Sequence, residues 1–130
     1  AHRDVVTSPL FSARLQYIDS MIATMRQALS QRDVKAVCQL AEEDTLNLHA
    51  ITMTSKSRMV LWEPQTLIVV REVLRLREKG IPCWYSMDTG PSVFVNTLGQ
   101  YANEVQASIR NSGVAPVIRS RVGGAPRVMP

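Results

Sequence analysis

The hydrophobic pattern of the chain changes at Gly80, and this change limits the folds that the sequence can adopt. Before Gly80, apolar residues recur every three to four positions, as they do along one side of an α-helix. After it, residues 83–87 and 92–96 follow the two-residue period that is typical of β-strands. The sequence therefore predicts a long helical segment followed by a smaller segment of strands.

Two helices are predicted in the first fifty residues. Ser8 offers a capping hydroxyl directly before Pro9, which suits the first helical turn, and Asp33 can cap a second helix. We expect the two helices to pack antiparallel across a turn near Gln31. The apolar stripe of the first helix comprises Phe11, Leu15, Ile18, Ile22, Met25 and Leu29. The predicted inward positions of the second are Val37, Leu40, Ala41 and Leu48.

The remaining elements follow from turn and cap signals. Residues 52–63 show no clear period and indicate a loop, with Trp62 as an aromatic anchor. Pro64 opens a third helix, which Gly80 ends as a left-handed cap. Its predicted inward residues are Leu67, Val70, Val73 and Leu74. Thr97 and Gly113 bound a fourth helix carrying Tyr101, Val105 and Ile109, and residues 114–121 are predicted to form a last strand before a short tail over residues 121–130.

These elements predict an α+β fold in one domain, residues 1–130. The two strands are separated only by Asp88-Thr89-Gly90-Pro91, so they should pair antiparallel across a tight turn. Helices must then cover one face of the sheet to bury their apolar stripes.

Composition excludes several classes of function. No apolar run is long enough to span a bilayer, so we expect no membrane partner. The net charge of +4 is spread among acidic residues rather than gathered in a basic run, so we expect no nucleic-acid partner. Cys38 and Cys83 lie in apolar settings without metal-ligand spacing, which predicts buried free thiols, no metal site and a reducing, cytoplasmic location.

Asp88 is the first candidate for chemistry. It follows an apolar strand and precedes Gly90 and Pro91, a setting in which an active-site carboxylate is often held. A turn aspartate that bonds its own backbone fits the same spacing, and the residues alone leave both interpretations open. The Asp-Thr-Gly triplet also occurs in aspartic proteases. Four helical patterns argue against that almost wholly β fold.

Two further candidates are weaker. His49 could ligate or shuttle protons, or it could be a helix-end residue that bonds a free carbonyl group. Lys56 and Arg58 could contact phosphate, or they could be solvated loop charges. The sequence does not decide either case.

Five segments, in order along the chain, resemble those of one enzyme family. Together they are similar to the C-terminal domain of the mevalonate diphosphate decarboxylases and phosphomevalonate decarboxylases, in the GHMP kinase superfamily. The fifth resembles the family signature F-T-x-D-A-G-P-N-V, in which Asp88 matches the catalytic aspartate. The segments are residues 7–15 (TSPLFSARL), 43–54 (EDTLNLHAITMT), 62–67 (WEPQTL), 77–83 (REKGIPC) and 86–93 (SMDTGPSV).

The resemblance implies a ferredoxin-like C-terminal half of a two-domain, ATP-dependent decarboxylase of the mevalonate pathway, with mevalonate 5-diphosphate as the expected substrate. In that family a mevalonate phosphate is phosphorylated on its tertiary hydroxyl and then loses phosphate and CO2, giving isopentenyl diphosphate from the diphosphate substrate. Asp88 would be the catalytic carboxylate, and Thr89 and Gly90 would shape the substrate pocket. ATP and Mg²⁺ would bind mainly through an N-terminal half that this chain lacks, so the chain alone should be inactive.

Two departures from the family pattern bear on the substrate. Thr89 and Ser92 stand where Ala and Asn are usual, and they resemble the archaeal-type branch that uses mevalonate 5-phosphate. A mevalonate 5-phosphate decarboxylase is therefore the alternative to the diphosphate enzyme. The presence of Asp88 argues against the related mevalonate 3-kinases. An alternative of another class is a noncatalytic interaction module whose first helix dimerises, and a homodimer is compatible with either interpretation.

Overall fold

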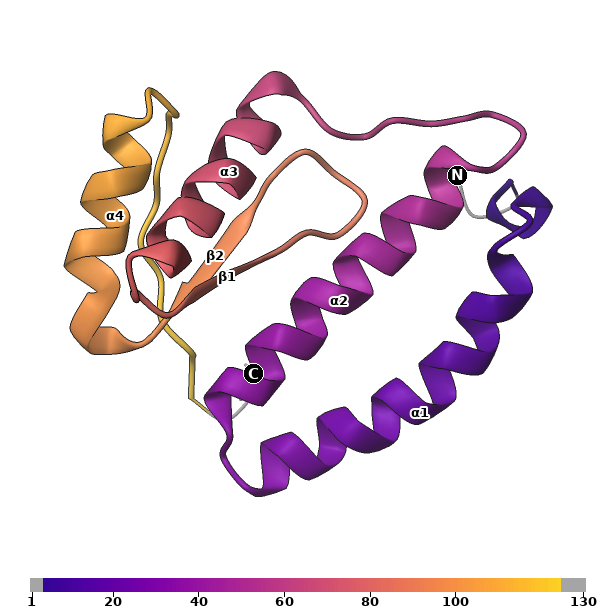
Figure 1. Cartoon of the computed structure of the whole chain (residues 1–130), viewed down its shortest axis with the longest axis horizontal. Coiled ribbons are helices and arrows are strands. Elements are labelled where there is room, and N and C mark those ends of the chain that lie inside the picture. The colour runs from indigo at the N-terminus through magenta and orange to yellow at the C-terminus, as the bar shows by residue number, and fades with distance from the viewer. Residues whose placement is uncertain (1–3, 125–130) are drawn as a thin grey trace, which may run out of the picture.

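The structure is a computed structural model and describes residues 4–124. Most of the predicted tail, from residue 125 on, lies outside the described residues. Within them the chain forms four α-helices, two strands and two short 3-10 helices (Figure 1). In order they are η1 (Val5–Thr7), α1 (Phe11–Ser30), α2 (Val34–Met53), α3 (Pro64–Glu78), β1 (Cys83–Ser86), β2 (Phe94–Thr97), η2 (Gly99–Tyr101) and α4 (Ala102–Asn111).

Helices α1 and α2 form the predicted antiparallel pair (Figure 1). The Asp33 side chain caps α2 by accepting the Ala36 N–H at 3.0 Å. Farther along the pair, the Arg14 guanidinium donates to Asp44 at 2.9 Å and to Asn47 at 2.7 Å. These two bonds join the helices through a polar contact where an apolar one was expected.

The first helix differs from its prediction at its start and in its buried side. It begins at Phe11 rather than Pro9, and Ser8 instead accepts the Leu10 N–H and bonds the Thr54 hydroxyl at 2.6 Å. Half of the predicted apolar stripe is exposed, at residues Leu15, Ile22 and Leu29. The stripe lies on one side of the helix, as predicted, but the structure turns much of that side away from α2.

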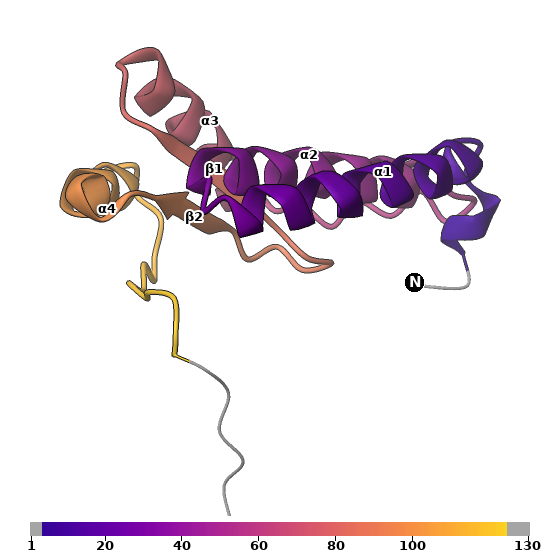
Figure 2. The same cartoon turned by 90° about the horizontal axis from the view of Figure 1, so that it is seen from below.

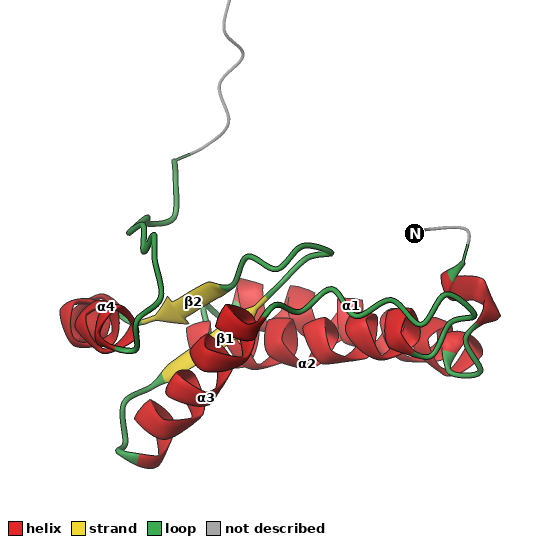
Figure 3. Ribbon diagram, turned by 90° about the horizontal axis from the view of Figure 1, so that it is seen from above, coloured by secondary structure: helices red, strands yellow, loops and turns green. Residues whose placement is uncertain are grey.

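The sheet has two antiparallel strands, in the register Cys83↔Thr97 to Ser86↔Phe94. Residues 87–93 connect them, so the link is longer than the predicted tight turn. Helix α3 lies on one side of the sheet, and the 87–93 connection projects toward the other (Figures 2 and 3). The predicted α+β class is confirmed.

The main core fills the space between α3, α4 and one face of the sheet. Gly80 ends α3 with φ +82°, as predicted, and the chain then turns back beneath the helix. Two predicted inward residues, Leu67 and Leu74, are instead exposed, because α3 buries the side one position away. The buried core residues are Val69, Val70, Val73, Leu76, Ile81, Cys83, Tyr85, Met87, Val105 and Ile109.

The C-terminal part contains two corrections. Thr97 is the last residue of β2, where its hydroxyl donates to the Pro82 carbonyl at 2.7 Å, and it does not cap α4. The predicted strand over residues 114–121 does not form. Pro116 has no N–H to give to a ladder, so Val114 and Val117 pack against the core from an irregular segment. Gly113 has φ +84° and ends α4 as predicted.

Both cysteines are buried and free, as predicted. Burial raises the pKa of the Cys83 thiol to about 11, so this group stays protonated at neutral pH. Among residues 4–124 no helix is both long and apolar enough to cross a membrane.

We predict that Val73→Ala will lower the free energy of unfolding by about 2 to 3 kcal/mol, because Val73 is fully buried and its loss leaves a cavity. Leu74→Ala is the matched control. Leu74 is 44% exposed, so the loss should stay below about 1 kcal/mol. Urea unfolding measures both values, and equal losses would contradict the placement of α3.

Candidate active site

Asp88 lies two residues beyond the end of β1, at the start of the connection to β2. Its side chain and that of Thr89 are exposed, whereas Met87 before them is 4% exposed. Within the described residues Asp88 forms no ion pair. The position of its carboxylate therefore depends on how the backbone of the connection is held.

One polar stripe of α2 holds the backbone that leads into Asp88. The Glu42 carboxylate accepts the Tyr85 N–H at 3.1 Å, and the Thr45 hydroxyl accepts the Met87 N–H at 3.0 Å. His49 Nε2 then meets the Asp88 carbonyl oxygen at 2.8 Å. Spacings of three and four residues place all three side chains on one side of the helix. These side chains lie along the other edge of β1, the one that is not paired with β2.

The bonds from Glu42 and Thr45 to the main chain matter because an unpaired backbone group is costly to bury. A buried N–H without an acceptor costs about 1 to 3 kcal/mol. Glu42 is itself fixed, because the Arg77 guanidinium donates to both of its oxygens, at 2.8 and 3.2 Å. The edge of β1 is thus closed by side chains from α2 rather than by a third strand.

His49 is 1% exposed and is neither at a helix end nor in solvent. The Asp88 carbonyl can only accept, so Nε2 must carry the proton that it donates. Burial lowers the pKa of His49, and the bond to the Asp88 carbonyl offsets part of that effect. The Trp62 ring meets the imidazole edge-on, with centroids 5.7 Å apart. Trp62 is therefore an anchor, as predicted, and one of its contacts is His49.

Thr66 holds the other end of the same connection. Its side chain, 1% exposed in the first turn of α3, donates to the Pro91 carbonyl at 3.0 Å. The same hydroxyl accepts the Glu63 N–H at 3.1 Å. The four residues 88–91 are therefore fixed at both ends by buried side chains from two different helices.

Asp88 also lines a cavity of about 280 Å³ on the side of the sheet away from α3. A second carboxylate, Asp44, lies in the same wall and is paired with Arg14. An added Cβ at Gly90 would meet nothing within 4 Å, so the chain leaves open space beside this segment. The cavity is lined by Met21, Met25, Ala41, Asp44, Thr45, Ser86, Met87, Asp88 and Phe94.

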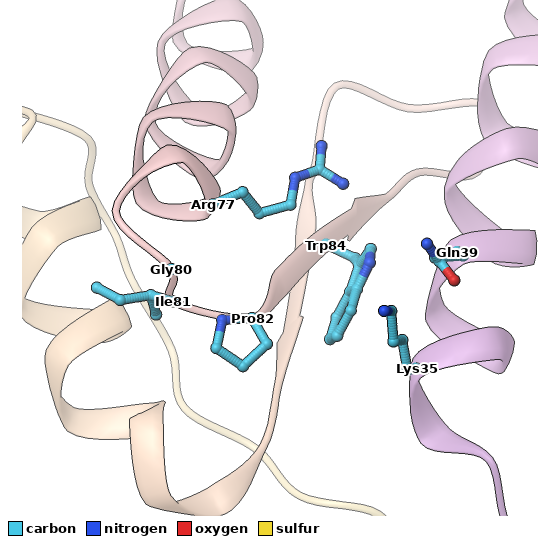
Figure 4. A pocket seen from close by; sticks show the side chains of 7 residues that line it. All are labelled: Lys35, Gln39, Arg77, Gly80, Ile81, Pro82 and Trp84. Atoms are coloured by element: carbon cyan, nitrogen blue, oxygen red, sulfur yellow. The ribbon is translucent and has the colours of Figure 1, made fainter.

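A second hollow, of about 260 Å³, lies near the beginning of α2 (Figure 4). Figure 4 shows Trp84 between Lys35 and Gln39 on one side and Arg77 on the other. Arg77 is already paired with Glu42, and none of the predicted site residues lines this hollow. The Asp88 cavity is therefore the better candidate for an active site.

The structure groups some of the predicted residues and separates others. Asp88, Thr89 and Gly90 are consecutive in the held connection, and His49 touches it. Lys56 and Arg58 are exposed in the loop after α2, and no hydrogen bond or ion pair in the described part of the chain joins either side chain to Asp88. Among residues 4–124 no group of three metal-ligating side chains lies together.

Sequence reasoning missed Glu42, Thr45 and Thr66 as site residues. Their partners lie 43, 42 and 25 positions away along the chain, so no local pattern predicts the contacts. One signal was available. Glu42, Thr45 and His49 place three polar groups on a single side of a helix, between positions that were expected to face inward.

Residues 2–121 match the family model of the mevalonate 5-diphosphate decarboxylase C-terminal domain. The chain belongs to this family. The resemblance carried by the five sequence segments is thus confirmed, and the signature around Asp88 lies in the connection that α2 and α3 hold.

Three comparisons describe the relatives of this family domain. It is 38% identical over 130 residues to the phosphomevalonate decarboxylase of Haloferax volcanii, covering 99% of this chain and 40% of that protein. The crystal structure of mevalonate diphosphate decarboxylase from Staphylococcus aureus is 26% identical, with a TM-score of 0.76 over 81% of this chain and 32% of that one. A structure of MDDEF in complex with MVAPP, AMPPCP and magnesium is 24% identical and shares the fold, with a TM-score of 0.77 over 82% and 33% of the two chains.

The family domain therefore spans less than half the length of each of these relatives.

We predict that Thr45→Val will destabilise the protein by about 1 to 3 kcal/mol, because it leaves the buried Met87 N–H without an acceptor. Thr45→Ser keeps the hydroxyl and should lose less. Urea unfolding of both variants checks the prediction, and a Thr45→Val variant as stable as wild type would contradict it.

We predict that stability will fall as pH decreases from about 6.5, the ordinary pKa of histidine. The lowered pKa keeps His49 neutral when folded, so below that pH the unfolded chain binds the extra proton and is favoured. Above it this contribution is fully present. Thermal unfolding between pH 8 and pH 5 should show the decline, and His49→Gln should remove the part due to this residue. An unchanged pH profile in His49→Gln would contradict the prediction.

Proposed function

We propose that this chain is the C-terminal half of an ATP-dependent decarboxylase that acts on a phosphorylated mevalonate. The observation that carries the proposal is the placement of Asp88. Its carboxylate is exposed, lies beside a cavity and stands on a connection whose backbone two buried side chains fix. Family membership supplies the reaction class.

In the proposed reaction Asp88 binds the tertiary hydroxyl of the substrate and orients or accepts its proton. This role requires hydrogen-bond reach, about 2.6 to 3.2 Å between heavy atoms. The hydroxyl oxygen then takes the terminal phosphoryl group of ATP. Loss of that phosphate together with CO2 leaves the isopentenyl product. Thr89 and Gly90 would line the substrate pocket next to the carboxylate.

ATP and Mg²⁺ would bind mainly to the rest of the protein. Residues 4–124 contain no grouped metal ligands, and the chain has no glycine-rich phosphate loop. The related structure that holds AMPPCP, an ATP analogue, and magnesium supports both cofactors. When bound, ATP supplies the phosphoryl group and Mg²⁺ neutralises the charge that develops on it. Asp88 contributes part of the cavity wall and the carboxylate on the substrate side.

For the substrate we favour mevalonate 5-phosphate, with the 5-diphosphate as the alternative. The Haloferax volcanii relative, 38% identical along nearly the whole chain, is a phosphomevalonate decarboxylase. Thr89 and Ser92 also stand where the diphosphate branch usually has Ala and Asn. The family model, named for the diphosphate enzymes, keeps the alternative open.

A noncatalytic interaction module is the second candidate, and the exposed side of α1 offers it a contact surface. Leu15, Ile22 and Leu29 repeat every seven residues and are 51, 43 and 58% exposed. The same surface would serve an enzyme half equally well, as a contact with the N-terminal half or with a second copy. A cytoplasmic location is part of the proposal, since buried free thiols suit a reducing compartment.

We predict that the full-length protein will release CO2 from mevalonate 5-phosphate in the presence of ATP and Mg²⁺, faster than from the diphosphate. Asp88→Asn should lower kcat by about 10²-fold to 10⁴-fold, because the carboxylate takes part in proton transfer. Asp19→Asn is the control, since Asp19 is an exposed carboxylate on α1.

Release from neither substrate by folded full-length protein would favour the interaction module. Normal turnover in Asp88→Asn would leave the reaction class intact and remove Asp88 from it. A faster reaction with the diphosphate would place the protein in the other branch.

A further inference from the structure

The exposed carboxylate of Asp88 needs a fixed backbone if it is to act on a substrate. No ion pair within residues 4–124 holds the side chain, and a Cβ on neighbouring Gly90 would meet nothing. Efficient transfer depends on geometry, since a displacement of about 1 Å can cost about 10²-fold in rate. The contacts that fix residues 88–91 therefore bear directly on the proposed chemistry.

The contact at Asp88 itself comes from His49. Nε2 lies 2.8 Å from the Asp88 carbonyl oxygen, and the imidazole is 1% exposed, so solvent cannot replace the bond without opening the core. The Trp62 ring against the imidazole edge limits its rotation. His49 is thus a buried donor of fixed orientation. It bonds the main chain of Asp88, whose side chain lines the cavity.

The contact at the far end comes from Thr66, whose hydroxyl donates to the Pro91 carbonyl at 3.0 Å. It is oriented by the Glu63 N–H, which donates to the same oxygen. The two donors stand on different helices, and residues 88–91 lie between them. Bonds to both carbonyls leave the Asp88 and Thr89 side chains free to meet a ligand.

We propose that His49 and Thr66 form a two-point clamp that positions Asp88 for the reaction, with His49 as the principal positioning residue. The inference rests on the proposed function, because it assigns a role to residues that support the proposed catalytic carboxylate. Neither side chain touches the substrate. Each acts through the main chain of residues 88–91.

The test compares two replacements of His49 in the full-length protein. His49→Gln keeps an N–H donor in a neutral side chain, and His49→Leu keeps apolar volume but removes the donor. We predict that His49→Leu lowers kcat by about 10-fold to 100-fold, with the KM values for ATP and for mevalonate 5-phosphate within about threefold of wild type. His49→Gln should recover most of the lost kcat.

Ile51→Val is the matched control for a loss of stability. Ile51 is 3% exposed on the same helix and makes no hydrogen bond to residues 88–91 through its side chain. It should lower the temperature of unfolding and leave kcat unchanged. His49→Leu should differ from this control, because its kcat should fall even where the two variants are destabilised to a similar extent.

A double mutant separates positioning from a general structural role. If His49 acts through Asp88, then adding His49→Leu to Asp88→Asn should change the residual rate by less than about twofold. Full additivity would overturn the clamp. So would a His49→Leu variant with wild-type kcat, or a His49→Gln variant no better than His49→Leu.

A spectroscopic arm does not depend on activity. In ¹⁵N-histidine-labelled full-length protein, the signal that His49→Gln removes should be that of a neutral imidazole protonated at Nε2. A neutral ring protonated at Nδ1 would overturn the clamp, since it could not donate to Asp88. If the wild-type protein releases no CO2, the proposed function is overturned, and the catalytic role of the clamp with it. If the wild type is active but the His49 variants do not behave as predicted, the clamp alone is overturned.

Discussion

The free edge of β1 is the constraint on which the rest of this structure depends. A two-stranded sheet leaves one row of backbone groups unpaired on each side, and such a sheet is marginal without further packing. Here Glu42 accepts the Tyr85 N–H of that edge and Thr45 accepts the N–H of Met87 just past the strand, while α3 and α4 cover one face. The position of α2 beside the strand therefore decides both the stability of the sheet and the direction in which the chain leaves it.

The same arrangement connects fold to site. Three of the segments that resemble the decarboxylase family are far apart in sequence, at residues 43–54, 62–67 and 86–93. In the structure they meet, because His49 and Thr66 bond the connection that carries Asp88. From the local sequence, His49 would be assigned to a helix end and Thr66 to a helical turn. In the structure both hold the connection that carries Asp88.

The sequence predicted most of the local structure, and the reasons are local. Asp33, Pro64, Gly80 and Gly113 begin or end helices through their own backbone or side-chain chemistry. What it could not predict was which side of each helix is buried. Periodicity shows which residues share a side, but a polar contact such as Arg14 with Asp44 can replace an apolar one and turn a stripe such as that of α1 outward.

The candidate site was predicted at its centre and not at its supports. Asp88 was found because a strand, a turn and a family signature coincide on it, whereas the donors that hold it come from 39 positions before Asp88 and 25 positions before Pro91. Pro116 marks the opposite case, because it is a local signal against the expected last strand: proline has no N–H to give to a strand ladder.

The spacing of the α2 side chains also limits how the length of the chain can vary. Each residue turns an α-helix by about 100°, so one residue inserted between Glu42 and His49 would swing part of the stripe away from β1. No change of side chain at the other positions could restore the register. An insertion in the loop between α2 and Trp62 would not rotate these side chains, because the chain there is not helical. Length should therefore be fixed within α2 and free to vary in the loop that follows.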